Sequence, residues 1–579
     1  MKEIKKIICT SLVITFFLSG NGFPADIYYL GSGGTDGAGA EYQRFSLSKR
    51  IKDLFDFSSY GQYGKDRSGK ISGRLMLEGN WQNVSGNKAK SFYSREDTDY
   101  RTELELSLHE KLVKDYALEG TVRLRKTDNP RIEPRTDLRM KQLSLRLGND
   151  VNSLRIGDLY AEFSPFTLGS SLEGFFAQGD PLMNCTVKGV AARTANADST
   201  TGFYQRNVFG GKVDYYFLRD SELFSLVRLG LQGITTQDDS SSAPELSSSA
   251  DLDNTVFGFD GEIRLRRWAG LSFEYAKSDY IANDDAVSGK DRAYGSALRV
   301  EPVLRFGKAG NLRYKYYYVQ PEFFTAVGSA SRDKEQHQFT YDVALGRKVQ
   351  ASFVENLYWD HLESSDRDKR TVYDEKYIRL LIRPFDRRPS FSFRPYVNHL
   401  RKRSDDPANS NEADTTTVGW ALSDRIWKAY VNTFYEYRAY DDKSTPENST
   451  YFNRFGVSVS RDWQVFGRRL YVSGSYSTDL RNTKQDPDKD VNTGLSFQGQ
   501  YDILDPVAIR FGHNIQHTNS AFSESDFRNF KSFLECDWLI FKKRATHLVC
   551  RGEYNRYDHE DGTQDYNETL VSLRLVSNF

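Results

Sequence analysis

The sequence predicts an all-β chain that closes into a single transmembrane antiparallel β-barrel. Beyond the N-terminus, segments of about ten residues alternate apolar and polar positions with a period of two, which is the pattern of a strand with one apolar and one polar face. The connections between these segments alternate between short and long. Short periplasmic turns at one rim and long extracellular loops at the other are typical of barrels that span a membrane.

Residues 1–25 predict a secretory signal peptide. Three lysines stand among the first six residues, and the apolar stretch from Ile7 to Gly20 that follows is too short to cross a bilayer as a helix. We therefore expect an exported chain that has lost Cys9 together with this leader.

Residues 26–70 predict a periplasmic tail in front of the first strand. The run GSGGTDG (31–37) lacks the lysine and the following helix of a phosphate-binding loop, so we interpret it as a flexible segment. The run SKRIKDLFDF (48–57) has the pattern of a short amphipathic helix that could lie inside the barrel.

Residues 71–579 predict the barrel itself. The alternation is clearest in YRTELELSLH (100–109), FGFDGEIRLR (257–266) and LRYKYYY (312–318). Counting such segments gives about 26 strands. An even number of strands leaves the first and the last residue of the barrel segment on the same, periplasmic side. A count of 24 is the alternative, because the stretch 160–195 contains three connections in quick succession. Its proline and its glycines could also fold part of that stretch into the lumen.

The composition agrees with a membrane barrel. No apolar run reaches the length of about 18 residues that a membrane-spanning helix needs. The mean hydropathy of −0.63 resembles that of a soluble protein, but a barrel hides its apolar residues at alternate positions and adds polar loops. Lysine plus arginine equals aspartate plus glutamate at 79 each, which argues against nucleic acid as a partner.

The polar faces of the strands predict the lining of the lumen. Charges of both signs are interspersed along these faces, so we expect a hydrated, mutually paired lining without strong charge selectivity. The residues that we place in this lining are Arg101, Glu103, Glu105, Arg123, Arg125, Asp260, Glu262, Arg264, Arg266, Arg313, Lys315 and Arg574.

The sequence predicts no metal site, no cofactor and no catalytic site. His513 and His517 stand four residues apart, which on a strand separates them by about 13 Å, too far to share one ion. No C-x-x-C-H motif for covalent haem attachment occurs. We therefore expect a protein that is not an enzyme.

The last strand carries a resemblance to a known class of proteins. In YNETLVSLRLVSNF (566–579), Leu573 and Leu575 lie on the apolar face and the chain ends in Phe579. Together with the signal peptide and the alternation, this strand resembles those of Gram-negative outer-membrane β-barrels, whose last strand commonly ends in phenylalanine and is read by the barrel assembly machinery. The resemblance implies a location in the bacterial outer membrane, with its lipid and the assembly machinery as partners. The run GDLYAEFSPFTL (157–168) is similar to stretches of uncharacterised barrels of this kind, which implies nothing about a substrate.

Two functions suit a barrel of this size. Twenty-six strands about 4.8 Å apart and tilted by about 40° enclose a ring roughly 50 Å across, so inward loops, side chains or another protein must fill it. We expect a porin-like channel that passes solutes. The alternative, which rests on a weaker resemblance to porin-cytochrome conduits, is a sheath around a lumen-filling periplasmic or lipoprotein partner such as a multihaem cytochrome. A plugged, energy-coupled transporter is disfavoured because residues 26–70 are too few for a plug domain.

Two cysteines predict the register of one hairpin near the end of the chain. If the turn KKR (542–544) is centred on Lys543, Cys536 and Cys550 face each other on the outer face of neighbouring strands, whereas Cys185 stands alone. A directly opposed pair has Cβ atoms about 4.5–5.5 Å apart, and a disulfide needs about 3.5–4.5 Å, so a bond is feasible with slight strain. The sequence is consistent with a disulfide formed in the oxidising periplasm and with two free thiols packed against lipid.

Overall fold

The computed structural model divides the chain into two units, Met1–Ile71 and Ser72–Phe579. In the first 68 residues it describes only two short paired strands, β1 (Asp26–Tyr28) and β2 (Arg44–Ser46). The predicted signal peptide and the predicted helix at 48–57 therefore lie outside the described residues. From residue 69 onward the structure describes the whole chain except 91–96, 113–115, 130–131, 134–135, 150, 183, 195–204, 240–241, 243–250, 284–290, 363–368, 405–410, 485–488, 521–525 and 561.

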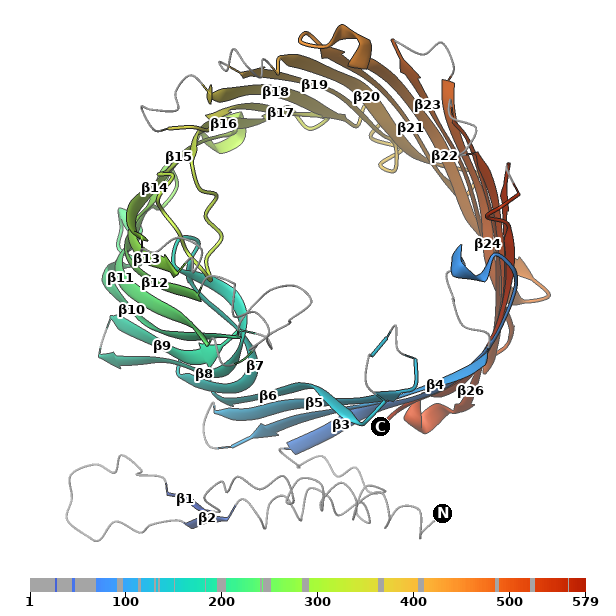
Figure 1. Cartoon of the computed structure of the whole chain (residues 1–579), viewed down its shortest axis with the longest axis horizontal. Coiled ribbons are helices and arrows are strands. Elements are labelled where there is room, and N and C mark those ends of the chain that lie inside the picture. The colour runs from blue at the N-terminus through green and yellow to red at the C-terminus, as the bar shows by residue number, and fades with distance from the viewer. Residues whose placement is uncertain are drawn as a thin grey trace. The chain divides into compact units, whose positions relative to one another are not determined.

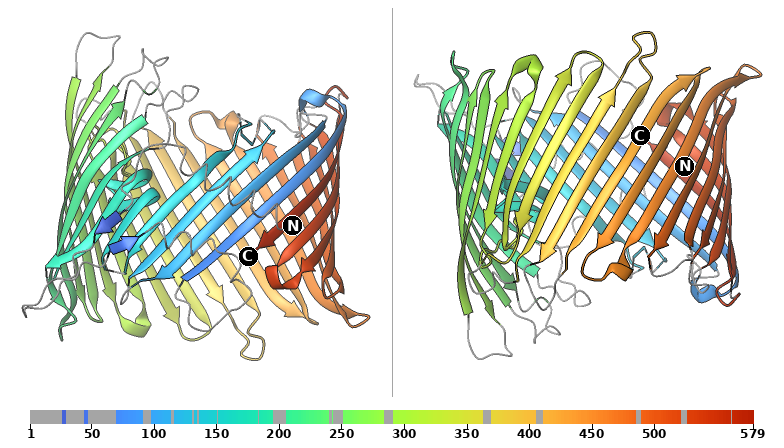
Figure 2. Two further views of the ribbon diagram at one scale, coloured as in Figure 1. Left: turned by 90° about the horizontal axis from the view of Figure 1, so that it is seen from below. Right: turned by 90° about the horizontal axis from the view of Figure 1, so that it is seen from above.

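The second unit contains the barrel. Each strand from β3 to β28 lies beside the strand that follows it in sequence, and β28 pairs back with β3, so the described residues form a closed barrel of 26 strands. This confirms the prediction of 26 strands against the alternative of 24. Figure 1 shows the ring and Figure 2 shows the tilt of its strands.

The first half of the wall consists of β3 (Gly69–Gly86), β4 (Asp97–Lys111), β5 (Ala117–Thr127), β6 (Arg139–Gly148), β7 (Ser153–Ser164), β8 (Leu168–Leu182), β9 (Cys185–Arg193), β10 (Gln205–Arg219), β11 (Phe224–Asp239), β12 (Asp251–Leu265), β13 (Ala269–Asn283), β14 (Asp291–Arg305) and β15 (Asn311–Val319). The second half consists of β16 (Lys334–Leu345), β17 (Val349–Trp359), β18 (Thr371–Ile382), β19 (Ser392–Ser404), β20 (Ala413–Ile426), β21 (Ala429–Asp442), β22 (Thr450–Val465), β23 (Arg468–Thr483), β24 (Lys489–Leu504), β25 (Val507–Asn519), β26 (Phe527–Phe541), β27 (Thr546–His559) and β28 (Tyr566–Asn578). Short 3-10 helices in the connections are η2 (Lys88–Lys90), η5 (Gly307–Ala309), η7 (Pro446–Asn448) and η9 (Lys542–Arg544).

The connections alternate in length around the ring, as the sequence predicts. At one rim, β20 and β21 are joined by Trp427 and Lys428, and β22 and β23 by Phe466 and Gly467. At the other rim, residues 320–333 join β15 to β16. We refer to the rim with the long connections as the outer rim.

The two faces of the wall differ in polarity. On β10, Phe209 and Val213 point outward and are 57% and 44% exposed on the isolated barrel, whereas Lys212 and Asp214 point inward and are buried. An apolar outer face and a polar inner face are what a barrel in lipid requires. No helix in the described part of the chain is long and apolar enough to cross a membrane.

Strands β7 and β8 leave the wall halfway along their length. β6 pairs with β7 over only five residue pairs, from Ser144–Gly157 to Gly148–Ser153, whereas β7 and β8 remain paired almost to their shared tip. Beyond Gly157 the two strands turn into the ring, where their ends are visible in Figure 1. We call residues 158–172 the inward hairpin.

The polarity of the inward hairpin explains why it turns. In the wall, outward positions are apolar, but the outward positions of β7 beyond Gly157 are Asp158, Tyr160 and Glu162. The apolar side chains Leu159 and Phe163 fall on inward positions. A hairpin with this phase would place carboxylates in lipid if it stayed in the wall. The chain therefore folds the hairpin into the lumen, where its apolar face is covered.

Glycines make the turn possible. Gly157 has φ = +93°, and a Cβ atom there would lie 2.0 Å from the Leu143 carbonyl oxygen. Gly174 faces Gly157 across the hairpin, and a Cβ atom there would lie 2.4 Å from the Ala192 Cα. Only glycine tolerates both the dihedral angle at the first position and the close backbone approach at both.

Candidate functional site: the lumen and its inner shelf

The inward hairpin meets a loop that is distant in sequence, residues 320–333. The Phe166 ring at the tip of the hairpin packs edge-on against Phe323, with ring centroids 5.9 Å apart. The Gly169 N–H donates to the Val327 carbonyl at 2.9 Å. We call the inward hairpin and residues 320–333 together the inner shelf.

The inner shelf rests on a row of small apolar side chains. Strands β9 to β15 each contribute inward residues to this row, and all of them are at most 9% exposed. Because the rest of the inward face is largely polar, the row supplies the apolar contact that holds the shelf against this part of the wall. Its members are Val190, Ala192, Val208, Ile234, Val256, Ala276, Ala297 and Val319.

Polar side chains of the same wall bind the backbone of the shelf. Asn254 donates its amide to the Phe324 carbonyl at 3.0 Å and accepts the Ala326 N–H at 3.0 Å. Glu274, which is 1% exposed, accepts the Phe166 N–H at 3.1 Å. These contacts satisfy backbone groups that would otherwise be buried without a partner, and so they fix the position of the shelf.

A buried charge network lies under the hairpin. Lys212 donates to Asp260 at 2.7 Å and to the Phe163 carbonyl at 3.0 Å. Arg228 contacts Asp260 at 2.6 Å and also pairs with Asp214. Two cations therefore balance two anions, and the removal of one partner would leave an uncompensated buried charge.

The sequence predicted only Asp260 from this network. Lys212, Asp214 and Arg228 were missed, although the same alternation that predicted the other lining residues applies to the run GGKVDYYF (210–217). What the pattern does not contain is the pairing of side chains on different strands. The contact between the inward hairpin and residues 320–333, which completes the shelf that buries them, joins segments distant in sequence and is also absent from any local pattern.

A second network brings together four of the predicted lining residues. Glu103, on β4, accepts hydrogen bonds from Arg101 at 2.6 Å, from Arg123 at 3.1 Å and from Arg125 at 2.5 Å. Glu105 points to the same face of β4. The other predicted residues lie elsewhere on the barrel. Glu262 and Arg264 form an ion pair at 2.5 Å, and Arg574 pairs with Glu78 at 3.4 Å. Arg313 and Lys315 lie on β15, where the Lys315 ammonium is 5.3 Å from the Tyr317 ring centre.

The prediction for Arg266 is wrong in one respect, because this residue lies in the turn after β12 rather than on the strand.

The inward face of β22 to β25 is rich in uncharged polar groups. The Ser475 and Ser496 hydroxyls lie 2.7 Å apart across β23 and β24. Hydroxyl and amide side chains flank them at neighbouring positions of the same face, so this part of the lumen is hydrophilic without a dominant charge. The flanking residues are Ser458, Ser460, Ser473, Ser477, Gln498, Asn514 and Gln516.

The described residues contain no cluster of three or more His, Cys, Asp or Glu side chains that could hold a metal ion. The two histidines that the sequence singled out lie on β25. His513 contacts the Ser532 hydroxyl through Nδ1 at 2.7 Å, and His517 faces Arg528 across the ladder.

The two cysteines of β26 and β27 lie where the sequence predicted. Cys536 and Cys550 are directly opposed in the ladder, which confirms the predicted register of this hairpin. The turn between them is η9, and the register shifts only beyond Leu539. Both thiols are free in this structure, so the disulfide remains a prediction.

The last strand closes the ring. Leu573 lies on the outward face of β28 and is 53% exposed, and Leu575 has the same orientation. Phe579 exchanges two backbone hydrogen bonds with Gly73, at 2.7 and 2.9 Å. The recognition of this strand by assembly machinery remains a prediction.

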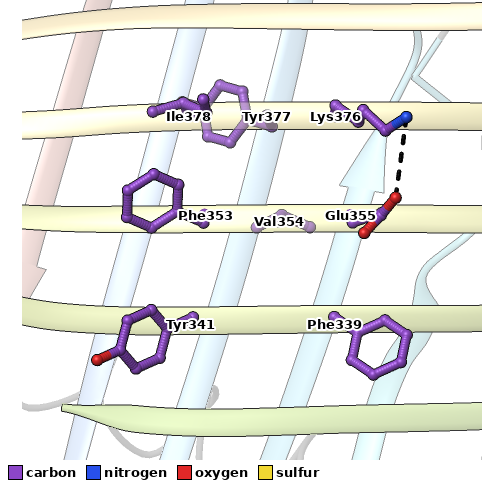
Figure 3. A pocket seen from close by; sticks show the side chains of 8 residues that line it. All are labelled: Phe339, Tyr341, Phe353, Val354, Glu355, Lys376, Tyr377 and Ile378. Atoms are coloured by element: carbon purple, nitrogen blue, oxygen red, sulfur yellow. Dashed lines mark ion pairs between the residues drawn. The ribbon is translucent and has the colours of Figure 1, made fainter.

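A shallow groove lies on the wall at β16 to β18, outside the shelf and the two charge networks. Figure 3 shows an ion pair in it, with the Lys376 ammonium 3.8 Å from the Glu355 carboxylate. Aromatic and aliphatic side chains surround this pair, and we assign no function to the groove. Its other lining residues are Phe339, Tyr341, Phe353, Val354, Tyr377 and Ile378.

Comparison with known proteins yields structural likeness only. No model of a known protein family matches the chain, and no curated protein matches it. Among solved structures, the chain is similar to the translocation pore of the P pilus usher PapC, with a TM-score of 0.35 and 9% identity over 87% of this chain and 99% of that one. It is also similar to the siderophore receptor PirA from Pseudomonas aeruginosa (TM-score 0.42, 10% identity, 89% and 81% coverage) and to OccK3 from the same organism (TM-score 0.26, 10% identity, 88% and 96% coverage). All three are outer-membrane β-barrels, and at these TM-scores we derive no function from them.

Proposed function

We propose that the protein is an outer-membrane channel through which hydrophilic solutes pass beside the inner shelf. The observation that carries this proposal is the placement of the shelf. Among the described residues its apolar contacts are with β9 to β15, and the inward face of β22 to β25 presents hydroxyl and amide groups. A polar, hydrated lining of this kind favours the passage of water-soluble molecules.

Weak charge selectivity follows from the lining. Arginines and carboxylates pair with each other along β4 and β5, as around Glu103, and the hydroxyl face of β23 and β24 carries no net charge. A permeating ion therefore meets mixed charges rather than a ring of one sign. We expect a cation-to-anion permeability ratio near one.

Conductance in planar bilayers tests this proposal. Purified protein is expected to conduct potassium chloride, and the reversal potential in a salt gradient is expected to lie close to zero. Ser475→Glu should move the reversal potential toward cation selectivity and Ser475→Arg toward anion selectivity, so the two variants at one lumen position control for each other.

The alternative function is a sheath for a partner protein. If the purified barrel does not conduct, and a haem protein co-purifies with it from the native membrane, the sheath replaces the channel. If the reversal potential is the same in both Ser475 variants, the ions do not pass along the face on which we place their path.

A further inference from the structure

The departure of the inward hairpin leaves a defect in the wall, which we call the seam. Over Arg139–Leu143, β6 pairs with β5 on one side, but the ladder to β7 begins only at Ser144. In the described part of the chain, no other strand takes the place of β7 along this edge. The outer half of the wall thus lacks the two strands that have turned into the lumen.

The seam lies at the level of the apolar outer surface. Leu145, just below it, is 38% exposed on the outward face. Leu138, directly before β6, and Met140, at the end of β6 that borders the seam, are 55% and 56% exposed. Because hydrocarbon cannot satisfy backbone N–H and C=O groups, an open strand edge at this depth must be in contact with water or another polar group.

The β6 edge is poorly suited to receive another polypeptide strand. The Leu143 N–H already donates to the Asp158 carboxylate at 2.6 Å. A register shift interrupts the ladder at Lys141, and both Lys141 and Arg139 pair with the Glu133 carboxylate. A bulge, a side-chain cap and basic residues are the features with which natural sheets prevent strand addition at an edge.

The hairpin presents a polar surface beside the seam. Its apolar face lies on the wall, so its opposite face, with Asp158, Tyr160 and Glu162, is turned away from that wall, and all three residues are exposed. Glu162 supplies a carboxylate and Tyr160 a hydroxyl, so this face favours groups that donate hydrogen bonds. A small molecule at the seam would therefore meet apolar contacts at Met140 and polar contacts at Tyr160 and Glu162.

We propose that the seam is a lateral opening between the lumen and the outer leaflet, and that it admits an amphiphile with an acyl chain and an uncharged, hydroxyl-rich headgroup. The acyl chain lies against Met140 on the lipid-facing side of the seam, and the headgroup lies at the Tyr160 face of the hairpin. This inference does not depend on the passage of solutes through the lumen, because it requires only the seam and the hairpin.

Fluorescence quenching from the membrane tests the opening. In a background with Cys185, Cys536 and Cys550 replaced by serine, a bimane fluorophore is attached at Tyr160→Cys in vesicles of phosphatidylcholine that contain a doxyl group on the acyl chain. Leu495→Cys on the outward face and Ser496→Cys on the lumen face are the matched controls. We expect quenching at position 160 that is weaker than at position 495, because the headgroup rather than the acyl chain lies there, but clearly stronger than at position 496, which responds only to aqueous iodide.

The headgroup is tested with two single-chain probes and a fluorophore at Ser171→Cys, which faces Tyr160 across the hairpin and leaves the Tyr160 hydroxyl in place. A doxyl-labelled monoacylglycerol is expected to quench position 171 several-fold more strongly than a doxyl-labelled fatty acid, whose carboxylate is repelled by Glu162. If position 160 is quenched by the acyl-chain label no more than position 496, the seam is closed to lipid and the proposal is wrong. If Tyr160→Cys does not fold, Ser171→Cys, which faces Tyr160 across the hairpin, replaces it.

A photo-cross-linker distinguishes an amphiphile from a polypeptide in the native membrane. With p-benzoylphenylalanine at position 160, adducts that carry acyl chains support the proposal. Adducts with a peptide segment of another protein would show that the seam binds a polypeptide, and they would overturn it.

Discussion

The conformation of Gly157 offers the sharpest test of the inward hairpin. Gly157→Ala places a side chain at φ = +93°, and its Cβ would lie 2.0 Å from the carbonyl oxygen of Leu143. A non-glycine residue held in such a conformation loses about 1–3 kcal/mol, and the overlap with a backbone atom cannot be relieved by a side-chain rotation. We therefore expect a loss of about 3 kcal/mol in the free energy of unfolding, or roughly a hundredfold in the ratio of folded to unfolded protein.

Unfolding by guanidinium chloride in detergent micelles, followed by tryptophan fluorescence, measures this loss. Gly189→Ala is the matched control, because Gly189 lies on β9, two strands from β7, and a Cβ atom there meets nothing within 4 Å. The control is expected to change the free energy of unfolding by less than about 0.5 kcal/mol. Equal midpoints for the two variants would show that β7 does not turn at Gly157, and the account of the seam would be refuted with it.

Three further changes test the shelf, the network beneath it and the cysteine register. Lys212→Met leaves the buried carboxylates with one cation fewer, so we expect a loss of about 3–5 kcal/mol in denaturant unfolding, and Asp260→Asn in the same chain should restore part of it. Phe166→Ala removes the ring that joins the hairpin to residues 320–333; we expect a loss of about 3–5 kcal/mol, and single-channel recordings should show a larger conductance because the shelf loosens. Mild oxidation is expected to protect Cys536 and Cys550 from alkylation together, and if both thiols, or either one, still react with the alkylating reagent, the pair is not bonded.

Much of the wall could be predicted from the sequence because its physics is local. Each strand carries its own alternation, and lipid on one side with water on the other determines which residues face which way. A short turn sets the register of the two strands that it joins, which is why the sequence alone places Cys536 and Cys550 opposite each other. The number of strands follows from the same local pattern.

The contents of the lumen could not be predicted in the same way. Phe166 packs on Phe323, and Lys212 pairs with Asp260, across long stretches of sequence. Side-chain pairing at such separations leaves no periodic signal in either segment. The proline and glycines of 160–195 showed that this stretch departs from the rule, but not where its tip would bind.

A signal for the inward hairpin is nevertheless present in the sequence, in the phase of its alternation. Up to Ile156 the outward positions of β7 are apolar, and from Asp158 they are polar. The first half of the strand therefore needs lipid on its outward side, and the second half needs water there. A strand in a lipid-facing wall cannot satisfy both halves, and a glycine at the point of reversal allows the chain to separate them. The wall complements the reversal, because β9 to β15 carry apolar residues at the inward positions where the hairpin lies. In a predicted barrel strand, an exchange of the apolar and polar faces next to a glycine therefore indicates a segment that leaves the wall. The preceding strand then has an unpaired edge, whose backbone N–H and C=O groups need water or another polar partner.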